Sequence, residues 1–420
     1  MSTRQILWAA FLLVHLGVAV IGWIAPGSAM GDVYLVYEPW STKATNGEGI
    51  MGVTEPFVYP QLALVPMLLA KAFAWAGGYI IAWSIVVTAL DAIAFAVLLG
   101  HGRRTFASQG RTYAAWFWLA GIAALGPVGM YRIDAIVVPI AILGLLWLAG
   151  RPVVAAALLA VGTWIKIWPA ALLATAFIVM RRRWSIAAVS VGISAIVAAG
   201  VLALGGAAHL LSFVSGQTGR GLQLEAPVST PYLWCTMFQQ PGCSVYYDTG
   251  ILTYQVTGPA IDTVIALMTP LLVLAVAAIV LLGAYKSRAG ASFVRLFPPL
   301  SLALVLVLIV FNKVGSPQFM TWLIPPIVFW IVLDRVRATV PAGLALALLG
   351  MTQLVYPFWY NFVLAASAPG VVLLTIRNIV EIVLLVIVVI RVVQVPTKAR
   401  VGLRETDVVD ADAASFSKGL

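Results

Sequence analysis

The stretch GSAMGDVYLVYEPWSTKATNGEGIMGVTEPFVYP, residues 27–60, follows the first apolar segment and decides how the rest of the chain is interpreted. Asp32 comes directly after a hydrophobic run, and Glu38, Glu48 and Glu55 follow it. A carboxylate at the boundary between lipid, water and protein is suited to acid–base chemistry, so Asp32 is the first candidate catalytic residue. A second interpretation also stands, in which Asp32 caps the helix predicted over 33–40.

The composition identifies the class of protein. The chain of 420 residues is 62% hydrophobic and 10% charged, with a mean hydropathy of +1.03. Soluble domains have about 25% charged residues, so we expect a polytopic membrane protein. The net charge of +10 comes from Lys and Arg clusters between apolar runs, which is typical of cytoplasmic loops. We therefore expect membrane lipid and no nucleic acid among its partners.

The apolar pattern predicts an all-α bundle of about twelve transmembrane or half-membrane helices in the cell membrane, with both termini cytoplasmic. The first span, 6–25, is expected to be retained and not cleaved as a signal peptide. Residues 61–75 are short and contain Pro66 and Lys71, which favours an interfacial half-helix. The membrane domain would cover 1–396, with external loops at 27–78, between spans 1 and 2, and at 205–258, between spans 7 and 8. The tail, 397–420, is predicted to be cytoplasmic and disordered.

Cysteines and histidines limit the chemistry. Cys235 and Cys243 lie in the second external loop, where an oxidising milieu permits a disulfide; two unpaired thiols are the alternative. The three histidines are far apart, and the chain has neither a P-loop nor an HExxH motif. No residues have metal-ligand spacing and we expect no cofactor, while assistance by a divalent metal stays open. ATP-driven transport and hydrolase activity lack their usual motifs.

Charged residues gather at the predicted external ends of the spans, where a buried charge is costly enough to indicate pairing or function. They are Asp32, Glu38, Glu55, Lys71, Arg132, Asp134, Lys166, Arg220, Glu225, Lys313 and Arg377. Arg377 can pair with Glu381, four residues on, or face an anionic phosphate. Asp91, inside the second span, has no evident partner. Carboxylates beside cations suit group transfer from a lipid-linked phosphate to a hydroxyl, with a general base and cations that stabilise the leaving phosphate.

Several segments, in chain order, carry a resemblance to a known family: GDVYLVYEPW with FVYPQLALVP, MYRIDAIVVP, WIKIWPAALL, GRGLQLEAPVS, FNKVGSPQFMTWLIPP and IRNIV. Over about residues 5–395 the chain resembles the family 87 glycosyltransferases, membrane enzymes of the GT-C class. It is similar in particular to the polyprenol-phosphate-mannose-dependent α-1,2-mannosyltransferases of actinobacterial envelopes. Those enzymes carry paired histidines in the turn corresponding to SPQFMTW, and this chain has none, which leaves an inositol-mannoside acceptor open.

The resemblance implies a GT-C-like fold and roles for individual residues. Asp32 corresponds to the catalytic aspartate of the first external loop. The donor phosphate would be bound by Arg132, Lys166 and Arg377. Sugar or acceptor would be bound by Glu55, Tyr59, Arg220, Gln223, Glu225, Lys313 and Gln318.

The expected activity is hexosyl transfer at the external face. A sugar, expected to be mannose, would pass with inversion from a polyprenyl-phosphate donor to a hydroxyl of an envelope glycolipid or glycan. A lipid-linked sugar flippase or secondary transporter without covalent chemistry is the competing class. The chain shows no internal repeat, and its polar residues gather on one side of the membrane and not at its midplane, which counts against a carrier. A scaffold that keeps an inactive transferase fold is a third interpretation.

Overall fold

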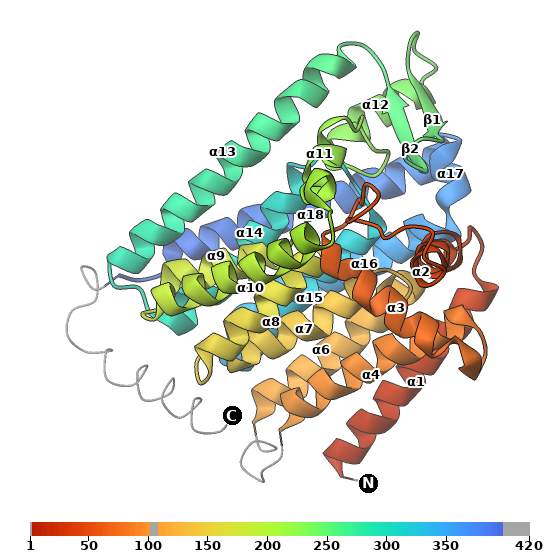
Figure 1. Cartoon of the computed structure of the whole chain (residues 1–420). Helices are drawn as coiled ribbons and strands as arrows, with labels where there is room; N and C mark the ends of the chain where they lie inside the picture. Colours follow the sequence, from red (N-terminus) through yellow and green to blue (C-terminus); the bar gives the residue numbers. More distant parts are fainter. Residues whose placement is uncertain (1, 101–107, 398–420) are drawn as a thin grey trace.

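The computed structural model describes residues 2–100 and 108–397 and is almost entirely helical (Figure 1). The predicted tail, from 398 onward, and the basic cluster at 101–104 lie outside the described residues. The helices are α1 (Thr3–Ile24), α2 (Glu38–Thr45), α3 (Leu64–Ala72), α4 (Tyr79–Leu99), α6 (Gln109–Leu125), α7 (Asp134–Trp147), α8 (Pro152–Ile165), α9 (Ala170–Val179), α10 (Arg183–Ala203), α11 (Ser212–Thr218), α12 (Thr230–Met237), α13 (Ile261–Arg288), α14 (Phe293–Val310), α15 (Ile324–Leu333), α16 (Arg335–Gln353), α17 (Tyr360–Leu364) and α18 (Ala368–Gln394). The two strands are β1 (Ser244–Asp248) and β2 (Thr253–Thr257).

Seven helical segments of the described residues are long and apolar enough to cross a membrane. They are Thr3–Ile24, Tyr79–Leu99, Arg183–Ala203, Ile261–Arg288, Phe293–Val310, Arg335–Phe358 and Ala368–Gln394. Six further apolar helical segments are shorter, among them Gln61–Ala72, which contains α3 and lies in the predicted half-helix. The structure therefore supports a nearly all-α membrane protein, and the expected total of about twelve spans remains a prediction.

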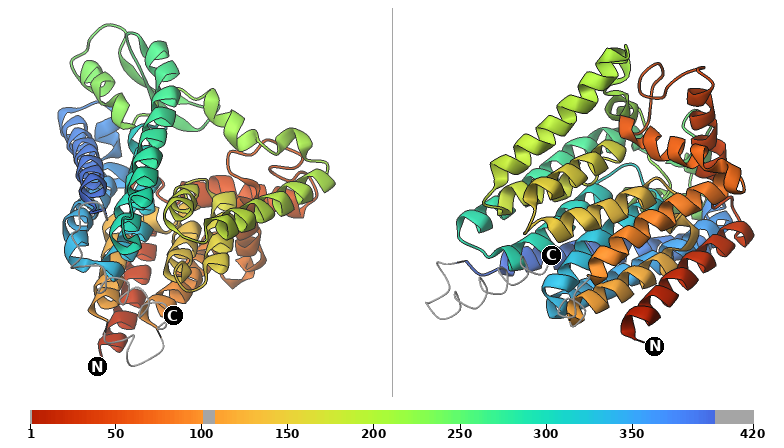
Figure 2. Two further views of the ribbon diagram at one scale, coloured as in Figure 1. Left: turned by 90° about the vertical axis from the view of Figure 1, so that its left-hand side faces the viewer. Right: turned by 60° about the horizontal axis from the view of Figure 1, so that its bottom comes forward.

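The long helices run side by side as one bundle around α7 and α14 (Figures 1 and 2). Both central helices are apolar on every face, which is the pattern of a helix surrounded by others. Small residues allow the close crossings inside the bundle. A Cβ on Gly144 of α7 would lie 2.9 Å from Leu159 of α8, so only glycine permits this approach.

A buried histidine–aspartate pair links the first two long spans. In α1, His15 Nε2 lies 3.0 Å from Asp91 Oδ2 of α4, and both side chains are almost fully buried. The other ring nitrogen of His15 lies 2.9 Å from the carbonyl oxygen of Phe11. Asp91 therefore has a partner that its sequence position did not indicate. Because a lone carboxylate is costly in hydrocarbon, the pair fixes how α1 packs on α4.

One end of the bundle carries the segments predicted to be external (Figure 1). Here α2 and α3 lie near a small subdomain built from α12 and an antiparallel hairpin, in which Ser244 pairs with Thr257 and Asp248 with Thr253. Residues 222–224 lie alongside β2 through an isolated antiparallel bridge between Gln223 and Gln255, and the Val256 amide donates to the Leu222 carbonyl oxygen at 3.0 Å. Apolar side chains of this subdomain pack with α17 and α18 in a second, smaller core.

Candidate active site

Asp32 lies at the end of the bundle that carries the segments predicted to be external, between a tight loop and one π-helical turn. The loop after α1 has left-handed backbone at Gly27 and Ser28, and the turn Val33–Tyr37 is anchored by two fully buried side chains, Val33 and Tyr37. The Asp32 side chain is 34% exposed. It makes no hydrogen bond to the backbone of the following turn, so the capping interpretation is not supported. The loop and the anchored turn therefore fix the position of Asp32, while its carboxylate stays accessible.

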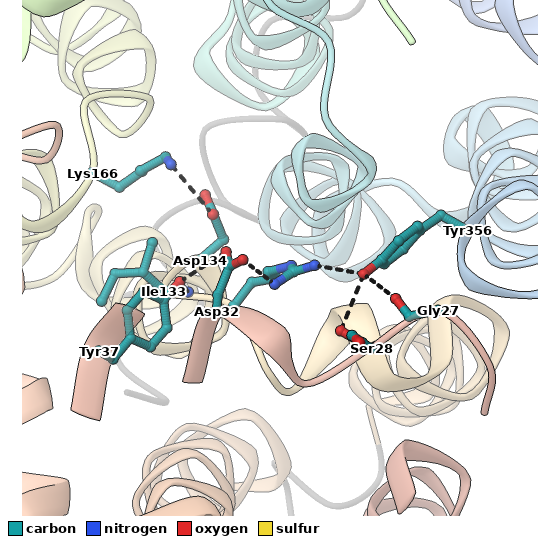
Figure 3. Close-up of polar contacts among 9 residues, drawn as sticks. Gly27, Ser28, Asp32, Tyr37, Ile133, Asp134, Lys166 and Tyr356 are labelled. Carbon is teal, nitrogen blue, oxygen red and sulfur yellow. Dashed lines mark hydrogen bonds and ion pairs between the residues drawn. The ribbon is translucent and has the colours of Figure 1, made fainter. Parts of the chain in front are cut away.

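Arg132, in the connection between α6 and α7, is the partner of Asp32. Its Nη1 lies 2.6 Å from Asp32 Oδ1, and the arginine side chain is only 8% exposed. Tyr37 holds the other side of the pair, because its hydroxyl donates to Asp32 Oδ2 at 3.4 Å and accepts from the Ile133 amide at 3.0 Å (Figure 3). Burial lowers the pKa of Arg132, but the Asp32 carboxylate and the nearby Tyr356, Tyr37 and Tyr59 hydroxyls together raise it more. The structure thus brings together Asp32 and one predicted phosphate ligand.

Tyr356, after α16, supports Arg132 from the opposite side. Arg132 Nη2 donates to the Tyr356 hydroxyl at 3.2 Å, and that hydroxyl lies 3.1 Å from the Gly27 carbonyl oxygen and 3.3 Å from that of Ser28 (Figure 3). One side chain therefore ties the cation to the loop that carries Asp32. The sequence did not single out Tyr356, because the aromatic run YPFWY at 356–360 is equally typical of an interfacial belt.

A second acid–base pair lies beside the first. Asp134 is fully buried and lies 3.6 Å from Lys166 Nζ, and its other oxygen accepts from Trp322 Nε1 at 2.6 Å. The Lys166 ammonium lies 4.5 Å above the ring of Tyr59. Burial lowers the pKa of Lys166, while Asp134 and Asp32 raise it. Lys166, which lies between α8 and α9, is therefore within electrostatic reach of Asp32.

Arg220 and Glu225 extend the charged region toward the small subdomain. Burial lowers the pKa of Arg220, and Tyr59 and Asp248 are near enough to oppose that effect. Arg220 Nε has no hydrogen-bond partner among the described residues. Burial raises the pKa of Glu225 to about 7, although Arg377 and Arg132 both lower it. Charges from four distant segments thus converge on one region.

Arg377 serves this region indirectly. Its Nη1 lies 3.3 Å from Glu225 Oε2, its Nη2 donates to the Glu225 carbonyl oxygen at 2.6 Å, and Asn378 accepts from the same guanidinium. The alternative in which Arg377 pairs with Glu381 on the same helix is not what the structure shows, because the ion-pair partner is Glu225 and both Glu381 oxygens lack a hydrogen bond in the described structure. Arg377 therefore fixes Glu225 in place, and its predicted contact with the donor phosphate stays a prediction.

The comparisons with known proteins bear on the segment that supplies most of these side chains. Residues 57–239 match the model of Glycosyltransferase family 87. The matched segment contains Tyr59, Arg132, Lys166, Arg220 and Glu225. No curated protein and no solved structure gives a significant match to the chain. The family match supports a membrane glycosyltransferase in general.

The remaining predicted residues lie at the edges of the site. Glu55 forms an ion pair with Lys43 and is one-third exposed. The Lys313 carbonyl oxygen accepts from the Gln223 amide at 3.0 Å, and burial lowers the pKa of the Lys313 ammonium. A Cβ at Gly315 would lie 2.1 Å from the Ala226 amide nitrogen, so the turn containing buried Gln318 packs directly against 225–226.

Two further sequence expectations concern the subdomain and metals. Cys235 and Cys243 are joined by a disulfide, with their Cα atoms 5.9 Å apart. The bond closes the chain between α12 and β1. Across residues 2–100 and 108–397, no group of three or more His, Cys, Asp or Glu side chains could hold a metal ion.

Proposed function

We propose that this protein transfers a sugar from a polyprenyl-phosphate donor to a hydroxyl acceptor, with Asp32 as general base. The observation that carries the proposal is the ion pair between Asp32 and Arg132. It places an accessible carboxylate next to a buried arginine, with Lys166 close by. These are the groups that take a proton from an attacking hydroxyl and stabilise a departing phosphate.

The reaction would be a single displacement at the anomeric carbon. The acceptor hydroxyl oxygen forms the new bond to this carbon while the bond from the carbon to the phosphate oxygen breaks. The hydroxyl proton goes to Asp32, and the electron pair leaves with the polyprenyl phosphate. Attack from the opposite face inverts the configuration, so a β-linked donor gives an α-glycoside.

The resting structure requires one change before this step. Arg132 is engaged by Asp32, so the guanidinium that would bind the donor phosphate and the carboxylate that would accept the proton occupy each other. We infer that the donor phosphate draws Arg132 away and so frees the base when substrate is present. Lys166, whose ammonium is shared between Asp134 and the ring of Tyr59, would provide a second positive charge for the leaving phosphate.

The proposal extends to substrate and location. Mannose is the proposed sugar, and an envelope glycolipid or glycan is the proposed acceptor, because both follow from the resemblance to polyprenol-phosphate-mannose-dependent enzymes. The site would face outward and both chain termini would lie in the cytoplasm. Arg220, Gln223 and the turn containing Lys313 and Gln318 border the charged region and are proposed to contact sugar or acceptor.

The test is sugar transfer by the purified full-length protein. Radiolabelled polyprenyl phosphomannose and an envelope lipid extract are supplied in detergent, and the product is analysed for a new glycosidic bond and its anomeric configuration. We expect an α-linked product and free polyprenyl phosphate. The contrary result is a donor that binds, or that crosses the membrane of reconstituted vesicles, while no polyprenyl-phosphate sugar, mannose included, gives a new glycosidic bond. The protein would then be a carrier and not a transferase.

A further inference from the structure

A cavity of about 190 Å³ lies at one end of the bundle. In Figure 1 the helix ends that form it lie on the opposite side from α2, the helix that follows the Asp32 segment. It is formed where α9, α10 and α13 meet, and it is lined by Phe177, Ile178, Arg183, Ala284, Ser287 and Arg288. None of these residues belongs to the site around Asp32. The left panel of Figure 2 looks onto the side of the bundle where α13 runs.

The cavity wall formed by α13 is fastened on both sides. Ser287 Oγ donates to the Ile178 carbonyl oxygen of α9 at 2.8 Å. Lys286 Nζ donates to the carbonyl oxygens of Val393 and Val395 at the end of α18, the second at 3.0 Å. The last turns of α13 are therefore held between α9 and α18, so the cavity does not need a ligand to form.

The lining is cationic on one side and apolar on the other. Arg183 and Arg288 come from two different helices, and the lining contains no carboxylate. Neither arginine forms an ion pair within the part of the chain that the structure describes. Phe177 forms the apolar wall and is met edge-on by Trp184, with ring centroids 5.5 Å apart. Trp184 itself is 71% exposed.

The surroundings distinguish a lipid from a free anion. The helices α10 and α13 expose most of their apolar length, since only 11% of the most apolar window of each is buried. A small anion would use only the two guanidinium groups. A phospholipid would also place its acyl chains along these two helices, beside Phe177 and Trp184. Basic pockets between membrane helices are known to suit anionic headgroups.

We propose that this cavity binds the phosphate headgroup of an anionic membrane phospholipid, held by Arg183 and Arg288. Arginine suits phosphate because its planar fork can make two parallel hydrogen bonds. The sugar donor of the proposed reaction would place its phosphate near Asp32, at the other end of the bundle, so the lipid here is a separate molecule. In the proposed topology, this end faces the cytoplasmic leaflet.

The experiment compares two double variants that change net charge equally. Arg183→Gln with Arg288→Gln removes the two cavity arginines, whereas Arg181→Gln with Arg182→Gln removes two exposed neighbours outside the lining. Binding of phosphatidylglycerol to the full-length protein in detergent is followed by native mass spectrometry and by the shift in Tm. Phosphatidylcholine and inorganic phosphate are the ligand controls.

We expect wild type and the Arg181/Arg182 variant to bind phosphatidylglycerol equally, and the Arg183/Arg288 variant to bind at least about 10-fold more weakly, as the loss of charge-assisted hydrogen bonds predicts. Phosphatidylcholine and inorganic phosphate should shift Tm little. Equal weakening in both double variants would show attraction to positive charge in general, and an equal response to inorganic phosphate would show an adventitious anion site. Either result overturns the proposal. If the Arg183/Arg288 variant does not fold, the single Arg288→Gln variant takes its place.

Discussion

Arg132 lies 2.6 Å from Asp32, so the proposed phosphate ligand and the proposed base hold each other in the resting structure. The pair is buried on the arginine side and open on the carboxylate side, with side-chain exposures of 8% and 34%. This asymmetry lets an incoming anion compete for Arg132 while an acceptor hydroxyl reaches Asp32. The same contact therefore explains how the base is oriented and which interaction the donor phosphate would replace.

The Tyr356→Phe variant removes the hydroxyl that joins Arg132 to the carbonyl oxygens of Gly27 and Ser28. We expect donor KM to rise and kcat/KM to fall by about 10-fold, since a hydrogen bond to a charged group contributes about 1.5–3 kcal/mol. Steady-state transfer kinetics measure this. Tyr113→Phe is the control, because Tyr113 keeps its ring against Arg335 after the change. An unaltered donor KM in Tyr356→Phe would show that Tyr356 does not support Arg132 in binding the donor phosphate.

The Lys166→Met variant leaves the Asp134 carboxylate buried without its cation. Breaking a buried pair from one side costs about 3–5 kcal/mol, so we expect a large loss of thermal stability. Adding Asp134→Asn should restore part of it, because the amide oxygen still accepts from Trp322 while the unpaired charge is gone. Thermal unfolding of wild type, both single variants and the double variant gives the interaction energy by a double-mutant cycle. Strictly additive losses would mean that the two side chains do not interact.

Glu225 should make stability depend on pH. Burial raises the pKa of Glu225 from its ordinary value of 4.5 to about 7, so the folded protein holds this proton more tightly than the unfolded chain. Its stabilising contribution is complete below pH 4.5 and is lost as pH rises to about 7. We expect Tm to fall over this window and the fall to be smaller in Glu225→Gln. An exposed acid, Glu48, provides the control variant Glu48→Gln. If Tm falls with pH at the same slope in Glu225→Gln and in wild type, Glu225 is not the cause of the pH dependence.

The disulfide should stabilise the small subdomain. Cys235 and Cys243 are eight residues apart and close a short loop, which by loop entropy contributes about 2–3 kcal/mol. We expect Cys235→Ser with Cys243→Ser to unfold this subdomain at lower temperature while the bundle keeps its helicity. Limited proteolysis and circular dichroism follow the two parts separately. Equal protease resistance with and without the disulfide would show that the hairpin is held by α17 and α18 alone.

Much of the site could be predicted from the sequence, because charges are rare in an apolar chain and each one needs a reason. That logic indicated Asp32, Arg132 and Lys166, which the structure places in one region. It failed where the signal was not a charge. Tyr356 and Trp322 are among many aromatic residues, and only the fold reveals which hydroxyl or indole reaches a charged partner.

Long-range pairing was the other limit. Helical spacing offered Glu381 as one possible partner of Arg377, but the partner is Glu225, in a loop that the hairpin and the 315–318 turn hold against α18. In the same way, Asp91 had no partner until α1 and α4 were seen side by side with His15 between them. Neither pairing follows from helical spacing, because it depends on which helices are neighbours.

The most direct test of the account is single-turnover sugar transfer by Asp32→Asn, measured together with donor binding. The amide keeps the shape of the side chain but cannot accept the proton, so we expect the transfer rate to fall by about 10²- to 10⁴-fold. Donor binding should persist, because Arg132 and Lys166 remain. Glu48→Gln should transfer sugar at the wild-type rate. Full activity of Asp32→Asn would contradict the account, because the proton would then have to go elsewhere.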